Sequence, residues 1–208
     1  MPRRFPSRLA LTVALSSLVA LAGACVAGAA SGPEVSVPAY HFTTTLPAGW
    51  QEVPLTGATL SKLVKAAIKA DPGLSADIQN ATKDGVKLFA IGPSSGGAVP
   101  NINILVEPAD GATQQAFLSQ APSEVRSTLG QAGAKVLSVR QVTLPQGKAV
   151  EANLVLPLNG GTQQAIETQW YLLHGSDVYI ATFTGPTPAA NAADLQELDA
   201  HWHWTTHA

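Results

Sequence analysis

The pentapeptide Gly92-Pro93-Ser94-Ser95-Gly96 offers the clearest pattern for nucleophilic chemistry in this chain. It matches G-x-S-x-G, the nucleophile elbow of α/β-hydrolases, in which a serine on a sharp strand-to-helix turn attacks an ester or amide. Here the following residues, 97–100, lead into a second β-prone run instead of a helix. We therefore expect a strand-to-strand loop, and a serine hydrolase using Ser94 is only a remote alternative.

Histidines near the end of the chain could bind a metal. Residues 201–204 read His-Trp-His-Trp, and His207 and Asp199 lie close by in the sequence. Two or three imidazoles with a carboxylate would suit zinc. Strand-like alternation explains the same pattern without a metal, because it turns the two histidines to solvent and the two tryptophans to the core. We expect no metal ligand, no cofactor and no catalytic residue.

The N-terminal residues have the layout of a secretory signal. Arg3, Arg4 and Arg8 precede residues 9–24, an uncharged and mainly apolar run that ends in small residues. A membrane-spanning helix needs about 20 apolar residues, and no basic cluster follows this run. Residues 1–24 are therefore predicted to be a signal peptide.

Cys25 is the only cysteine and lies at the end of this leader. The string Leu21-Ala22-Gly23-Ala24-Cys25 resembles the bacterial lipobox, although the leucine stands one place further from the cysteine than in the commonest form. The resemblance implies a diacylglycerol, with the acyl chains such as palmitate that lipoproteins carry, on Cys25 and a chain anchored to the outer face of the cell membrane. The alternative is cleavage after Ala24 and simple secretion.

Composition indicates one globular domain. The chain has 208 residues, of which 46% are hydrophobic and 12% charged. Residues 25–38 are rich in Ala, Gly, Ser and Pro and predict a flexible tether, which leaves 39–208 as a single domain. Without residues 1–24, nine basic residues remain against 14 acidic ones, a net charge of −5. This charge argues against nucleic acid as a partner.

Periodicity predicts an α+β fold, with a largely antiparallel sheet flanked by helices. Alternation in residues 150–156 and 166–172 indicates an apolar sheet face that the helices cover. Pro122 is expected to restart a helix, and short Gly-bearing loops predict hairpins between the last four strands. The predicted strands are 40–45, 86–91, 102–106, 134–144, 148–156, 164–173 and 177–184. The predicted helices are 60–69, with Lys62, Lys65 and Lys69 on its polar face, a short one at 74–82, 113–132 and 188–200.

The order of these elements, with the opening Phe42 and Leu46-Pro47-Ala48-Gly49-Trp50, resembles the PsbP-like fold. With the lipobox and tether it is similar to actinobacterial lipoproteins of the LpqN type. This resemblance implies a non-enzymatic binding or accessory role in the cell envelope, with an envelope protein or a lipid as possible partner. The high apolar content leaves a second class open, a carrier of a small apolar or lipid ligand between helices and sheet.

Overall fold

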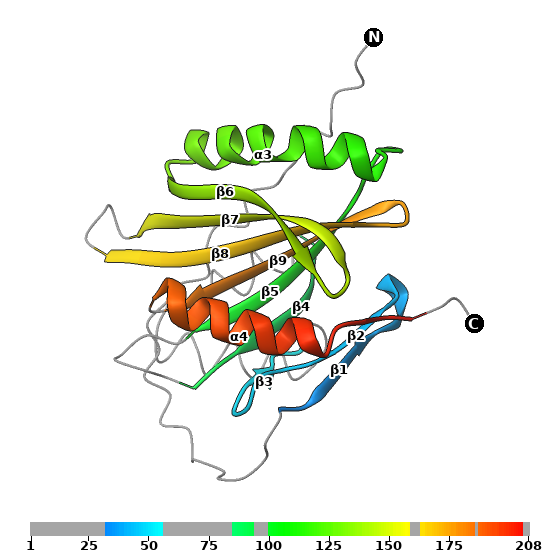
Figure 1. Cartoon of the computed structure of the whole chain (residues 1–208). Helices are drawn as coiled ribbons and strands as arrows, with labels where there is room; N and C mark the ends of the chain where they lie inside the picture. Colours follow the sequence, from blue (N-terminus) through cyan, green and yellow to red (C-terminus); the bar gives the residue numbers. More distant parts are fainter. Residues whose placement is uncertain (1–31, 56–84, 94–99, 159–162, 186, 206–208) are drawn as a thin grey trace.

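The computed structural model describes residues 32–55, 85–93, 100–158, 163–185 and 187–205, which form two antiparallel sheets and two α-helices (Figure 1). This confirms the predicted α+β class. The elements are β1 (Glu34–Val37), the 3-10 helix η1 (Pro38–Tyr40), β2 (Phe42–Thr45), β3 (Gln51–Glu52), β4 (Val86–Ile91), β5 (Asn101–Pro108), α3 (Gln114–Gln131), β6 (Lys135–Leu144), β7 (Gly147–Leu158), β8 (Gln163–His174), β9 (Asp177–Gly185), α4 (Pro188–Ala200) and β10 (His203–Trp204).

The larger sheet has seven strands in the order β3-β4-β5-β9-β8-β7-β6. Every neighbouring pair is antiparallel. The last four strands form the predicted hairpins, and their bounds agree with the predicted ones within two residues. β6 is the outer strand of this sheet on the side of α3 (Figure 1).

Both faces of the large sheet are buried, which corrects the expectation of a single apolar face. Leu154 of β7 lies opposite Glu167 of β8, so the apolar sets at 150–156 and at 166–172 point to opposite faces. α3 packs with the first set, and α4 packs with the second. The inner strands therefore need apolar residues at both odd and even positions, whereas the outer strand β6 has no buried residue.

Two details of the helices differ from expectation. α3 runs without interruption through Pro122, which was expected to restart it. On α4, Leu195 and Leu198 are fully buried as predicted, but Ala192 is exposed. Asn191 is buried in its place and donates to the carbonyl oxygen of Ile166 at 3.0 Å, which ties α4 to β8.

The smaller sheet joins the two ends of the described chain. β2 lies between β1 and β10 and pairs with both. Residues Glu34–Val37 were assigned to the tether, whereas the structure places them in β1, with Val35 buried. Any tether behind Cys25 therefore ends before Glu34. The predicted helices 60–69, with its lysines, and 74–82 lie outside the described residues.

Candidate functional site

Cys25, Ser94 and His207 lie outside the described residues. The described part of the G-x-S-x-G motif has a structural explanation. The N–H of Gly92 donates to the carbonyl oxygen of Pro100 at 2.8 Å between two antiparallel strands, β4 and β5. A Cβ atom on Gly92 would lie 2.6 Å from the ring of Trp50. Glycine is thus required there by packing, and the motif connects two strands rather than a strand and a helix.

The C-terminal histidines do not converge on a metal site within the described residues. His201 and His203 are exposed, and no group of three metal-ligating side chains occurs in the parts of the chain that the structure covers. Trp202 is buried and Trp204 packs against the core, as alternation predicts. The ring of His174 stacks on Trp204 with centroids 3.9 Å apart. Burial of the imidazole lowers the pKa of His174, and the nearby charge of His41 lowers it further.

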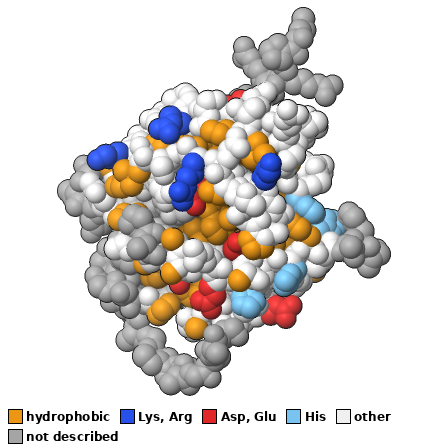
Figure 2. All heavy atoms as spheres, viewed as in Figure 1, with side chains coloured by type: hydrophobic (Ala, Val, Ile, Leu, Met, Phe, Trp, Pro, Cys, Tyr) orange, Lys and Arg blue, Asp and Glu red, His pale blue; other side chains and the backbone are white. Residues whose placement is uncertain are grey.

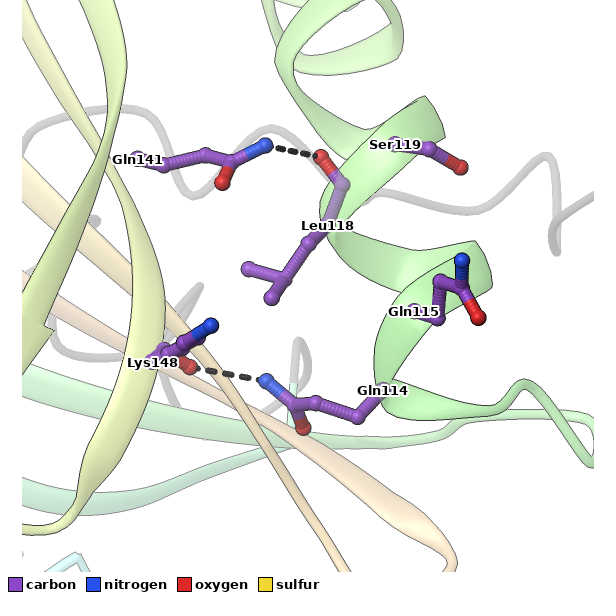
Figure 3. A pocket seen from close by; sticks show the side chains of 6 residues that line it. All are labelled: Gln114, Gln115, Leu118, Ser119, Gln141 and Lys148. Carbon is purple, nitrogen blue, oxygen red and sulfur yellow. Dashed lines mark hydrogen bonds between the residues drawn. The ribbon is translucent and has the colours of Figure 1, made fainter.

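A groove of about 540 Å³ opens between the first turns of α3 and the strands β6 and β7 (Figure 3). Four of its lining residues come from α3, one from β6 and one from β7. They are Gln114, Gln115, Leu118, Ser119, Gln141 and Lys148. The side chains of Gln114, Gln141 and Ser119 each donate to a backbone carbonyl oxygen. The Gln115 amide and the Lys148 ammonium are therefore the groups most available to a carbonyl or carboxylate group of a ligand.

Pro122 helps to explain why Gln141 faces this groove. A proline inside a helix has no N–H for the carbonyl four residues earlier, here that of Leu118. The side chain of Gln141 donates to this carbonyl oxygen at 2.9 Å (Figure 3). Gln114 makes a similar cross-link, since its amide donates to the carbonyl oxygen of Lys148 at 2.9 Å. Two glutamines therefore hold α3 to the β6–β7 hairpin.

We expect Gln141→Leu to lower the free energy of unfolding by about 1 kcal/mol, because it leaves the Leu118 carbonyl without its partner. In a Pro122→Ala background the restored amide can bond to that carbonyl, so the same substitution should cost much less. Urea unfolding of the two single variants and the double variant measures this coupling. Gln120→Leu, an exposed change on the same helix, is the control. If Gln141→Leu lowers the free energy of unfolding equally in the wild-type and Pro122→Ala proteins, this role of Gln141 is contradicted.

The groove has a positive electrostatic character. The N-terminus of α3 is capped by Thr113, whose hydroxyl accepts from the N–H of Ala116, and its first turn carries no acidic residue. The positive end of the helix dipole and Lys148 therefore act on the same groove. The one ion pair recorded among the described residues, Arg140 with Glu151 at 2.8 Å, does not involve Lys148. Within the described part of the chain, the Lys148 ammonium is therefore available to an anionic group.

A second polar cluster is fully buried beneath the α3 side of the sheet. Glu167 accepts hydrogen bonds from Gln169 at 3.1 Å and from Thr184 at 3.2 Å, and the hydroxyl of Tyr171 donates to Gln169. Burial raises the pKa of Glu167 to about 8, which outweighs the opposing effect of the two hydrogen bonds. Glu167 is therefore a neutral carboxylic acid in the folded protein at pH 7.

This cluster extends across two further strands. Thr182 and Asn103 follow Gln169 in register on β9 and β5, and both are fully buried. The Thr182 hydroxyl and the Asn103 amide make no hydrogen bond with the described residues. This cluster is not among the sequence-based predictions, because alternation indicated only one covered face of the sheet. Polar residues at alternate positions of β5, β8 and β9 are the signal that could have revealed it.

Comparisons with known proteins support the fold. No family model matches the chain, and no curated protein matches its sequence. The solution structure of cyanobacterial PsbP, CyanoP, from Synechocystis has a TM-score of 0.55 and 11% identity, and the match covers 88% of this chain and 98% of CyanoP. This similarity shows that the described chain has a PsbP-like fold.

Two other solved structures are similar at lower TM-scores. LpqN of Mycobacterium tuberculosis, described as involved in cell envelope biogenesis, has a TM-score of 0.45 and 11% identity over 84% of this chain and 86% of LpqN. A chain from Bacteroides thetaiotaomicron has a TM-score of 0.49 and 15% identity over 85% of this chain. The match spans only about half, 49%, of that longer protein.

Proposed function

We propose that this chain is a non-enzymatic binding module of the cell envelope, a lipoprotein of the LpqN type anchored outside the cytoplasm through Cys25. The groove between α3 and β6–β7 is the observation that carries the binding role. It combines an open cavity with several donors and acceptors, and two glutamine cross-links hold its walls. Rigid walls lower the entropy that binding costs.

The residues that line the groove are mostly polar, although most of the surface that faces the groove belongs to carbon atoms. A carrier of acyl chains needs a pocket lined mainly by apolar side chains, and Leu118 is the one apolar residue among the six that line this groove. An acyl chain would also cover the Lys148 ammonium with methylene groups, which cannot accept hydrogen bonds. We therefore prefer a polar partner, and the carrier is the alternative.

The extracytoplasmic location rests on the predicted leader, on Cys25 and on the PsbP-like fold. Within the described residues, no helix is long and apolar enough to cross a membrane. Two acyl chains on Cys25 would bury on the order of 30 methylene groups, at about 0.8 kcal/mol each. Such an anchor would hold the domain at the membrane without help from its own surface.

Cys25→Ala should move the protein from the membrane fraction to the soluble extracytoplasmic fraction, because the substitution removes the acceptor of the lipid. Fractionation followed by immunoblotting measures the shift, and Cys25→Ser, which also lacks the thiol, should behave alike. A membrane-bound Cys25→Ala protein would contradict the anchor. A wild-type protein found only outside the membrane would instead support the secreted alternative.

The binding role is tested separately from the anchor. Chemical cross-linking in intact cells, followed by purification of the full chain, should yield a defined envelope partner. Gln115→Arg together with Ser119→Arg would fill the groove from the exposed side of α3 and should reduce the yield of that partner. A full chain that cross-links to nothing in the envelope would contradict the binding role even if Cys25 carries lipid.

A further inference from the structure

We propose that the free edge of β6, together with the groove beside it, binds an extended acidic segment of another polypeptide as an eighth strand of the large sheet. The proposal rests on the binding role above and adds the chemistry and the geometry of the partner. It depends on three features of β6, namely its exposed backbone, its regular stretch and the charge beside it.

β6 is the outer strand of the seven-stranded sheet and is ten residues long. None of its residues is buried, although those of β7 alternate between buried and half-buried over most of the strand. Among the described residues, its backbone forms strand hydrogen bonds to β7 and none on its other side. Alternate N–H and C=O groups of an outer strand point away from the sheet, where they can pair with an added strand.

A bulge divides β6 into a closed and an open part. The register with β7 shifts between Val136 and Ser138, and the intervening Leu137 is 48% exposed. A bulge interrupts pairing and increases the local twist. From Ser138 to Leu144 the register is continuous, which leaves seven regular residues for a partner strand. These residues include Gln141, which lines the groove.

Charge identifies the partner as acidic. β6 carries no acidic residue. Of its two basic residues, Arg140 is paired with Glu151 of β7 and Lys135 precedes the bulge. The positive charge beside the regular stretch therefore comes from Lys148. Lys148 of β7 lies opposite Thr143, on the groove side of the sheet. Neighbouring strands lie about 4.8 Å apart, so an added strand would run about 10 Å from β7, within the combined reach of a lysine and a glutamate side chain. A glutamate directed into the groove would meet Lys148 near the positive end of α3.

The distribution of charge on one face of the molecule agrees with this assignment. On the face in Figure 2, the basic side chains gather in the half nearer α3 and β6, and most acidic side chains lie in the half around α4 and the C-terminal residues. An acidic strand would therefore be attracted to the β6 side of this face. A second copy of the chain is a poorer partner, because its β6 strand carries no acidic residue that could meet Lys148.

The test uses the full chain purified in detergent and a fluorescent seven-residue probe, Val-Glu-Val-Glu-Val-Glu-Val. We expect saturable binding by fluorescence anisotropy that weakens as salt is raised. A probe with glutamine in place of glutamate should bind less well. Two further probes, N-methylated at alternate residues on one edge or on the other, separate backbone pairing from charge. One should lose binding entirely, and the other should keep it.

Lys148→Gln should weaken binding of the acidic probe about threefold, as expected for one exposed ion pair. Lys87→Gln removes the same charge from β4, where Lys87 lies over the ring of Tyr40, and should leave the affinity unchanged. Equal binding of the two N-methylated probes, or no binding of the acidic probe, would overturn the proposal. So would a dimer in sedimentation that the probe dissociates, since that result assigns the edge to a second copy.

Failure here can be told apart from failure of the proposed function. If the full chain captures an envelope partner but binds no acidic strand, the proposed function stands and the β6 assignment is wrong. If the probes bind as expected but no envelope partner is captured, the edge is a strand acceptor and the envelope role fails.

Discussion

Glu167→Gln should nearly abolish the pH dependence of stability between pH 6.5 and 8.5. The pKa of Glu167 is raised from 4.5 to about 8 in the folded protein because the carboxyl is buried. The folded state therefore keeps a proton that the unfolded state has lost. Stability from this group is fully present below pH 4.5 and falls as pH rises to about 8, by on the order of 1 kcal/mol per pH unit.

The glutamine variant keeps the shape of the neutral acid and cannot ionise. It offers one carbonyl oxygen where the acid accepts from both Gln169 and Thr184, so it should be less stable than wild type near pH 5 by about 1 kcal/mol. The two stability curves should cross as pH rises, with the variant more stable above pH 8. Urea unfolding at a series of pH values measures both curves.

Asp199→Asn is the matched control for this titration. Burial raises the pKa of Asp199 to about 6, partly opposed by a hydrogen bond from Gln146. The stability that Asp199 contributes also falls as pH rises, but this fall is complete near pH 6. Asp199→Asn should therefore flatten the dependence of stability on pH only below pH 6. Parallel curves for wild type and Glu167→Gln above pH 6.5 would show that Glu167 is ionised in the folded protein.

Trp202→Ala should lower the free energy of unfolding by about 3 to 5 kcal/mol, the cost of deleting a buried large aromatic side chain. Trp202 is 5% exposed and stacks on Phe42 with centroids 4.7 Å apart. Its ring also meets the edges of Tyr179 and Trp204. These contacts hold the segment after α4 against β2, so their loss should detach β10 from the small sheet.

Trp204→Ala is the comparison for this prediction, because Trp204 also has one stacked and two edge-on ring contacts, with His174, Tyr179 and Trp202, but is only partly buried. Trp204→Ala should lower the free energy of unfolding clearly less than Trp202→Ala does. Trp202→Phe, which keeps a ring on Phe42, should recover part of the loss. Chemical denaturation gives the three values, and hydrogen exchange of the Thr43 amide, which lies opposite His203, reports whether β10 is released. Similar costs at positions 202 and 204 would contradict the assigned role of Trp202.

Local signals were strong enough to predict most elements of the domain. The hairpins between β6 and β9 follow from short Gly-bearing connections, which leave little freedom in how consecutive strands pair. α4 follows from Pro188 at its start and from its apolar spacing. β1 was missed because Glu34–Val37 is short and surrounded by Gly, Pro and Ser, and only pairing with β2 makes it a strand.

The sequence by itself determined the class of fold, the last four strands and the residue expected to carry a lipid. Tertiary structure alone decided which polar residues meet. Gln141 and Pro122 are 19 positions apart, yet one supplies the hydrogen bond that the other removes from Leu118. Glu167 lies in an alternating strand and is buried because both faces of the sheet are covered. Burial and pairing depend on contacts between distant segments, and local periodicity does not encode those contacts.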